Sequence, residues 1–285
     1  MIQSSLWIRF SNKPFALPAL FVLATITLLA AFGGWLAPFD PTLTHDHYLL
    51  LPPFWDERGV VNFLLGTDDL GRDMLSRLIH GARLTMGSAT IAVAIAGMGG
   101  WILASVLKFM PHVLSAPINR FMDTLLALPS MLLAVLFSIA FGTSISTAIL
   151  AVAMALLPHF YRVTYRALRS EYKREYVSAA RLDGANTATL YFQTLLPNIA
   201  VPLVVQLTIA FSTAILDIAA LGFLGLAATG AAPEWGNILS SAHDFIQVAP
   251  WTVALPGAAI LITVLCVNVV GGALRECIDP KGSTR

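Results

Sequence analysis

The chain has 285 residues, of which 57% are hydrophobic and 12% are charged, and its net charge is +1. Soluble domains carry roughly 25% charged residues, so this composition excludes an ordinary soluble protein and predicts a membrane protein. A net charge this close to zero does not indicate nucleic acid as a partner.

The N-terminal part of the chain predicts one membrane-spanning helix. Residues 1–16 carry Arg9 and Lys13, and the run over 17–36 is uncharged. That run has the length of about 20 residues that crosses a bilayer core. We therefore expect residues 1–16 to be cytoplasmic and residues 17–37 to form the first transmembrane helix. The run lacks an A-x-A-like site, so no cleavable signal peptide is expected.

Residues 38–83 form an expected external segment with many turn-forming residues. Thr67, Asp68 and Asp69 precede a helical pattern, and their side chains are suited to cap its first turn. The alternative is a cation or substrate site on the same acids, but their spacing is not that of a calcium loop. We assign no metal site to this segment.

Residues 84–274 are expected to hold five further transmembrane helices, which makes an all-α protein with six spans and a cytoplasmic tail over 275–285. The first of these helices carries a small residue at every fourth position, a pattern that allows close helix packing. The small residues are Ala92, Ala96, Gly100 and Ala104. The five apolar runs cover 84–107, 124–141, 144–161, 199–224 and 251–274.

Two ionisable residues lie within the expected spans. Asp217 is near the outer end of its span, and a carboxylate inside a membrane is a functional hypothesis by default. It either lines a translocation path or bonds to a neighbouring helix. His159 is either a proton carrier or an interface histidine. Cys266 and Cys277 lie about 16 Å apart along helical sequence, so no disulfide between them is expected.

The distribution of positive charge sets the expected orientation. Of the 17 lysines and arginines, four fall in external segments under these boundaries, and all the others fall in cytoplasmic ones. Cytoplasmic loops carry the excess of such residues, so both termini are expected in the cytoplasm. The four external residues are Arg58, Arg72, Arg77 and Arg83.

The longest cytoplasmic loop, over 167–198, contains the polar stretch EYVSAARLDGANTATLYFQTLLPN. It predicts two short helices joined at a corner. The first ends just before Gly184, the residue type expected where a helix closes in a left-handed turn. Asn186 or Thr187 is suited to cap the second helix.

The same stretch carries a patch of small side chains, Ser178, Ala179 and Ala180. Beside a glycine corner, such a patch lets another protein approach the backbone closely. The pair Leu196-Pro197 is expected to end the second helix. An ordinary cytoplasmic loop with a surface helix is the alternative.

The spacing of Ala-Ala, Gly and Leu-Pro in this loop resembles the coupling loop of ABC-importer permeases. Ser178 stands where that pattern has Glu, and Thr194 stands where it has Ile; loss of the Glu is usual in the peptide-transporting branch. The runs LLGTDDLGRDMLSRL, TLLALPSMLLA, AILDIAALGFLG and PEWGNIL resemble the second permease subunit of dipeptide, oligopeptide and nickel importers. EYVSAARLDGA and APWTVALPGAAI are similar to the Sap-type C subunit, from a system linked to antimicrobial-peptide resistance.

The resemblance implies the type I ABC-importer permease fold in a bacterial inner membrane, with residues 38–83 in the periplasm. It implies as partners a second, homologous permease, two ATPase subunits and a periplasmic substrate-binding protein. The expected substrates are peptides, including antimicrobial peptides, and putrescine export is the alternative. The residues implied to couple to the ATPases are Ser178, Ala179, Ala180, Gly184, Leu196 and Pro197.

The chain carries no catalytic motif of its own. It has no G-x-x-x-x-G-K-[ST] phosphate loop, so ATP is expected only on partner subunits and no cofactor is expected on this chain. Two other protein classes are alternatives. A secondary transporter would show inverted repeats and ionisable groups near mid-membrane. An intramembrane enzyme would need a nucleophile paired with a base, or metal ligands, and Asp217 alone supplies neither.

Overall fold

A computed structural model describes residues 2–227 and 232–278, and its regular elements are helices. Residues 279–285, the greater part of the expected cytoplasmic tail, lie outside the described residues. The elements are α1 (Ile2–Ser11), α2 (Ala16–Leu36), α3 (Met74–Phe109), α4 (His112–Leu126), α5 (Ser130–Phe141), α6 (Ile145–Glu171), α7 (Glu175–Leu182), α8 (Thr187–Thr189), η1 (Leu190–Leu195), α9 (Leu196–Phe223), α10 (Trp235–Ala242), η2 (His243–Phe245) and α11 (Pro250–Ile278).

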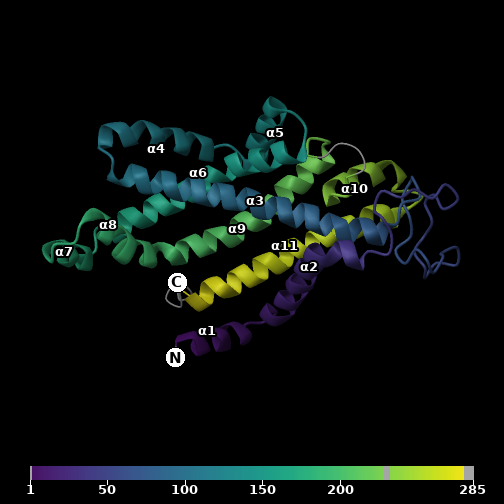
Figure 1. Ribbon diagram of the computed structural model, residues 1–285, viewed down its shortest axis with the longest axis horizontal. Coiled ribbons are helices and arrows are strands. Elements are labelled where there is room, and N and C mark those ends of the chain that lie inside the picture. The colour runs from purple at the N-terminus through teal and green to yellow at the C-terminus, as the bar shows by residue number, and fades with distance from the viewer. Residues whose placement is uncertain (1, 228–231, 279–285) are drawn as a thin grey trace.

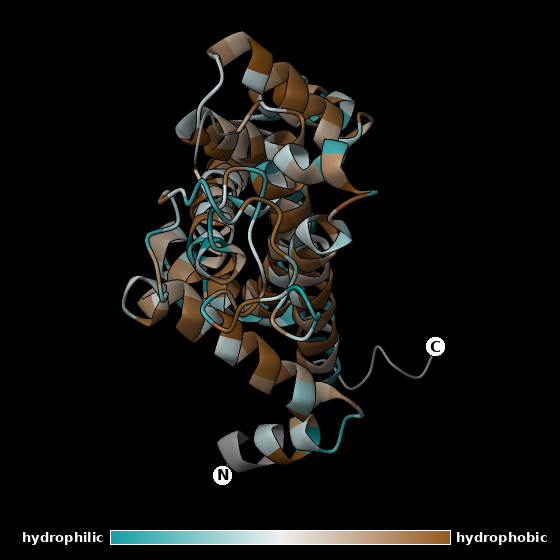
Figure 2. Ribbon diagram, turned by 90° about the vertical axis from the view of Figure 1, so that its right-hand side faces the viewer, coloured by the Kyte–Doolittle hydropathy of each residue, from teal (hydrophilic) through white to brown (hydrophobic). Residues whose placement is uncertain are grey.

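Long apolar helices form the body of the molecule. Among the described residues, five helical stretches are long and apolar enough to cross a membrane, and a sixth span results when the bent pair α4 and α5 is counted as one. Figure 1 shows the loop between α2 and α3, which is the segment expected to be external and is called the external segment below, at one end of the bundle and α7 at the other. In Figure 2 hydrophobic colours dominate the bundle helices, and hydrophilic colours gather in the loops. The prediction of an all-α membrane fold is confirmed.

The expected third span is not one continuous helix. α4 and α5 meet at an angle of 101° around a short break that ends at Pro129. Proline lacks a backbone N–H, and it pushes the residue before it out of helical conformation. The helix over 124–141 was therefore a wrong prediction, although Pro129 was the signal for the break.

α3 begins ten residues before the expected second span, at Met74 rather than residue 84. Asp73 caps it, because a side-chain oxygen of Asp73 accepts a hydrogen bond of 2.8 Å from the backbone N–H of Ser76. The helix has 36 residues and is therefore about 54 Å long, well beyond the roughly 30 Å of a bilayer core. The external segment thus ends near residue 73, and the predicted boundary at residue 83 falls inside a helix.

The stripe of small residues on α3 packs against α6. Ala92, Ala96 and Ala104 have no exposed surface. At Gly100, an added Cβ would lie 2.6 Å from Cβ of Phe160 and 2.7 Å from the backbone nitrogen of Tyr161. Only a residue without Cβ permits this approach, so the predicted close packing of the stripe is confirmed.

The two ends of the described chain pack together. Phe10 and Ala16, near the start, form a buried cluster with Ala273 and Cys277 of α11. Lys13 also forms an ion pair with Glu276. Both cysteines are buried and free, as expected.

Gly100→Ala should lower the thermal stability of the full chain in detergent, because the new methyl group overlaps α6. Overpacking of this kind costs roughly 1–3 kcal/mol. The matched control is Gly97→Ala, one turn earlier, where a Cβ would lie at an ordinary 3.5 Å from the Phe160 ring. Equal melting temperatures for the two variants would contradict the close contact at Gly100.

Candidate coupling surface and external clamp

The helix α7 lies at one end of the bundle, and most of its residues are exposed. Its Val177 is 1% exposed and belongs to a buried cluster with Leu168 of α6 and Leu195 of η1. Ser178 and Ala179 lie on the exposed side, and Ala180 is partly buried against the same cluster. Ser178 and Ala179 thus form a strip of small side chains that is open to a partner, and α7 also exposes Tyr176 and Leu182.

Gly184 ends α7 in the predicted left-handed turn, with φ of 86°. Its N–H donates to the carbonyl of Arg181, and the N–H of Ala185 donates to the carbonyl of Ala180, both at 3.0 Å. These two bonds make a Schellman motif with glycine at the position that needs positive φ. A Cβ at Gly184 would meet nothing within 4 Å, so the backbone conformation alone selects glycine here.

The second helix does not end at Leu196-Pro197, which corrects the prediction. Asn186 caps it by accepting from the N–H of Thr189 at 2.8 Å, and the chain then stays helical through η1 into the long α9. η1 is a π-helix, and Pro197 is the second residue of α9. A π turn displaces the normal i→i−4 bonding, so a proline without N–H is accommodated. The loop is therefore continuous with a membrane span.

A cationic layer attaches α7 to the neighbouring helix ends. The ammonium of Lys108 lies 3.9 Å from the centroid of the Tyr172 ring, and the guanidinium of Arg181 lies 4.2 Å from it. Cation–π contacts of this kind contribute about 0.5–1 kcal/mol each at exposed sites. They tie the end of α3 to the end of α6 and to α7.

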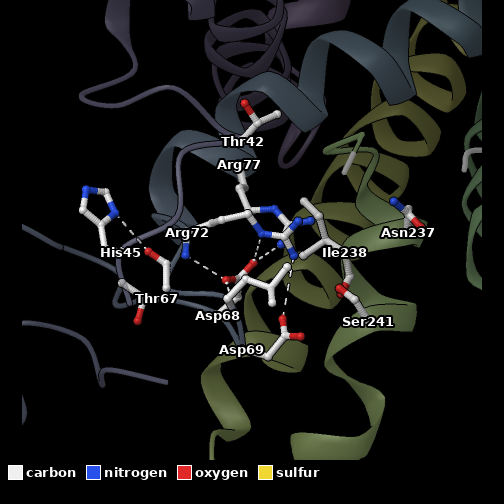
Figure 3. A network of polar contacts seen from close by, with 12 residues as sticks. Thr42, His45, Thr67, Asp68, Asp69, Arg72, Arg77, Asn237, Ile238 and Ser241 are labelled. Carbon is white, nitrogen blue, oxygen red and sulfur yellow. Dashed lines mark hydrogen bonds and ion pairs between the residues drawn. The ribbon is translucent and has the colours of Figure 1, made fainter. Parts of the chain in front are cut away.

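At the opposite end, a buried ionic cluster holds the external segment on α3 (Figure 3). Asp68 pairs with Nε of Arg72 at 2.7 Å and with the guanidinium of Arg77, and all three side chains are at most 6% exposed. Arg72 also reaches Asp69 at 3.7 Å. We call Asp68, Arg72 and Arg77 the external clamp.

The residues predicted to cap this helix, Thr67, Asp68 and Asp69, do not cap it. Thr67 and Asp68 bind loop backbone, and Asp73 supplies the cap. Burial raises the pKa of the Asp69 carboxyl, with a further contribution from the charge of Asp68. The Asp68 carboxylate is occupied by two guanidinium groups, and the described residues contain no group of three or more ligands suited to a metal ion.

A second buried carboxylate, Glu234, joins α3, α9 and α10. It caps α10 by accepting from the N–H of Asn237 at 2.9 Å, and it accepts a hydrogen bond of the same length from the Thr85 hydroxyl. Burial raises the pKa of this carboxyl above its ordinary value, although these hydrogen bonds oppose the rise. The indole N–H of Trp235 donates to the carbonyl of Leu78 at 2.9 Å. Sequence reasoning missed Glu234, and the signal was an acid directly before a short helix, with Asn three residues later.

Asp217 lies against the bend between α4 and α5. It is 5% exposed on α9, and the hydroxyl of Ser130, the first residue of α5, is its polar neighbour. Its Oδ2 has no hydrogen-bond partner among the described residues. Free N–H groups at a helix start carry partial positive charge, which favours a carboxylate there. His159 is half-buried in α6.

Asp68→Asn should strongly destabilise the protein. It removes the charge that compensates two buried guanidinium groups, and breaking a buried pair by removing one partner costs roughly 3–5 kcal/mol. The matched control is Asp56→Asn, in the same segment, because Asp56 pairs with the exposed Arg58 at 3.3 Å. An exposed pair contributes about 0–1 kcal/mol. Thermal unfolding in detergent measures both variants, and equal losses would exclude the clamp as a stabilising element.

The geometry defines a multispan membrane protein with a short, exposed helix at one end. Two family profiles match the sequence: "binding-protein-dependent transport system inner membrane component" over residues 96–283, and "N-terminal TM domain of oligopeptide transport permease C" over residues 4–53. The chain belongs to the family of binding-protein-dependent transport system inner membrane components.

Relatives match over nearly the whole chain. The di/tripeptide transport system permease protein DppC of Pseudomonas aeruginosa is 46% identical over 96% of this chain and 91% of its own length. The peptide transport system permease protein SapC of Escherichia coli O6:H1 is 47% identical over 95% of this chain and 92% of its own length. Among solved structures, a chain of an inward-facing MetNI methionine ABC transporter matches this protein with a TM-score of 0.60 and 18% identity. The match covers 72% of this chain and 97% of the other chain. The predicted ABC-importer permease fold is confirmed.

Proposed function

We propose that this chain is the permease subunit of an ATP-driven transporter that moves peptides across a bacterial inner membrane. The observation that carries the proposal is the exposed strip of small residues on α7, closed by the left-handed turn at Gly184, in a chain of this family. The sequence has no phosphate loop of its own, so ATP binds to separate subunits. The chain is a permease and not an enzyme.

Two ATPase subunits, a second, homologous permease and a periplasmic substrate-binding protein complete the proposed assembly. The strip Ser178-Ala179-Ala180 receives one ATPase, while Gly184 fixes the corner and Leu196-Pro197 continues the loop into α9. The second permease packs against apolar faces that this chain leaves open, for example at Leu132, Leu136 and Ile139 of α5, which are 54–64% exposed. Both termini lie in the cytoplasm, in keeping with the arginine and lysine distribution.

Transport follows from the continuity of this loop with the bundle. When the ATPases close on ATP, α7 moves with them. The small side chains of α7 let the ATPase surface pack closely against the helix, so the two surfaces do not slide past each other. α7 follows the end of α6, and η1 leads without a helical break into α9, so the displacement reaches two spans directly. Rotation of these spans closes one side of the path and opens the other. The chain itself supplies the mechanical link.

Peptides are the proposed substrates, in line with the printed functions of the relatives DppC and SapC. Antimicrobial peptides are included on the resemblance to the Sap-type subunit. Putrescine export is the competing assignment. Labelled dipeptide and labelled putrescine, offered to the same reconstituted complex, separate the two.

Ala179→Trp should uncouple ATP hydrolysis from peptide transport. An indole on the exposed side of α7 occupies the space of the docked ATPase, and overpacking costs roughly 1–3 kcal/mol, equivalent to about a 5- to 150-fold weaker contact. The matched control is Glu57→Trp, which adds the same ring at an exposed site of the external segment. The measurements are ATPase retention on purification and dipeptide uptake. Retention and uptake equal to those of the control would exclude α7 as the coupling element.

We propose further that Asp217 ties α9 to the start of α5 and does not bind substrate. Asp217→Asn keeps an acceptor for the Ser130 hydroxyl, so assembly and dipeptide uptake should stay within about twofold of the unmodified chain. Asp217→Leu removes the acceptor and should lower the yield of assembled complex, since an unpaired buried group costs about 1–3 kcal/mol. A complex of Asp217→Asn that assembles normally but has lost uptake would instead place this carboxylate on the translocation path.

A further inference from the structure

A hollow of about 640 Å³ opens between α4 and the ends of α3 and α6. Five cationic side chains line it, namely Lys108, Arg120, Arg162, Arg166 and Arg169. We call it the basic hollow. The hollow shares Arg169 with the loop over 167–198 and Lys108 with the Tyr172 contact, but the strip Ser178-Ala179-Ala180 lies outside its lining.

Positive charge in the hollow is poorly compensated. Asp123 is its acidic lining residue and pairs with Arg162 at 2.6 Å. Nε of Arg162 is buried and has no hydrogen-bond partner among the described residues. Arg120, Arg166 and Arg169 form no ion pair within the described ranges of the chain. Lys108 and Arg162 are half-buried, whereas Arg120, Arg166 and Arg169 are exposed. Five cations gathered around one carboxylate leave an excess of positive charge, so the hollow favours an anion.

The depth of the hollow matches the boundary between hydrocarbon and headgroups. Measured along α6 from its first residue, Arg162 lies at about 26 Å, Arg166 at about 32 Å and Arg169 at about 36 Å. A bilayer core is about 30 Å thick. The arginines therefore straddle the level at which phospholipid phosphates lie, whichever way the chain is oriented.

The helix α4 forms one wall of the hollow and presents a polar side and an apolar side. Ser115, Asn119 and Asp123 recur at helical spacing on the side that lines the hollow. Val113, Leu114 and Phe121 lie on the outer side and are 82%, 58% and 58% exposed. An anion with acyl chains suits both sides, because its phosphate enters the hollow while its chains cover the apolar surface beside it.

We propose that the basic hollow binds the phosphate of an anionic phospholipid headgroup. Arginine binds phosphate oxygens with two parallel hydrogen bonds, and basic pockets between membrane helices are known to select anionic headgroups. The space suits a headgroup and is too small for a partner's helix, since a helix is 10–12 Å across and the hollow would hold little more than one turn. The proposal does not depend on the transport function, and its test involves no transport step.

The test is native mass spectrometry on the full chain in a zwitterionic detergent, titrated separately with phosphatidylglycerol and phosphatidylethanolamine. We expect one phosphatidylglycerol to bind more tightly than phosphatidylethanolamine. Arg166→Gln combined with Arg169→Gln should weaken that site about 30-fold, which corresponds to about 2 kcal/mol for two charges. The matched control is Lys173→Gln with Arg174→Gln, which removes two nearby exposed charges outside the hollow and should change binding less than threefold.

Three results would overturn the proposal. The first is equal binding of the two lipids. The second is an equal loss of phosphatidylglycerol binding in the two double variants. The third is displacement of the bound anion by inorganic phosphate at the same concentration as by phosphatidylglycerol. The last result would identify a free-phosphate site. A cross-link from Arg166 to an acidic side chain of a co-purified protein subunit would also replace the lipid with a protein partner. If the double variant melts early, the exposed Arg120→Gln serves instead, with an expected weakening of about fivefold.

Discussion

Because Gly100 lets α3 approach the backbone of α6, these two helices form a rigid pair on which the other spans pack. Phe160 and Ala92 belong to a buried cluster that also takes in Ile215 of α9 and Val267 of α11. Water is absent from the hydrocarbon region, so contact between lipid-exposed helices gains little from the hydrophobic effect and depends on how closely the backbones approach. A bulky residue in the small-residue stripe would separate α3 from α6. The buried cluster would then lose the contacts between its residues on these two helices.

α3 also connects the two faces of the molecule. Its first turn is held by the external clamp, and its last turn carries Lys108 against Tyr172 beside α7. A single helix of about 54 Å thus joins the external segment to the proposed coupling surface. The continuous α3 contrasts with α4 and α5, which the bend at Pro129 separates.

The success of sequence reasoning depended on whether the relevant signal was local. Uncharged runs of bilayer length located the spans, and Gly184 was placed in a left-handed turn because few other residues adopt positive φ. The predictions that failed concern residues whose partners lie more than two helical turns away in the sequence. Nothing near Arg77 in the sequence indicates that it reaches back to Asp68, or that Thr85 meets Glu234 across 149 positions. Pro197 was misjudged for another reason, since a π turn ahead of a proline leaves helical continuity intact. The sequence does not indicate the basic hollow, because α3, α4 and α6 each contribute only part of its charge.

Glu234 has a consequence for how this chain can change through evolution. A Cβ at Gly222 would lie 2.1 Å from the carboxylate of Glu234, and a Cβ at Gly236 would lie 1.9 Å from the carbonyl of Ala219. α9 and α10 therefore meet at two glycines, and the carboxylate of Glu234 fills the space that a side chain at Gly222 would need. Any lineage that gains a side chain at Gly222 must shorten or lose Glu234, so the two positions should covary, and single replacements at either should be rare among functional relatives.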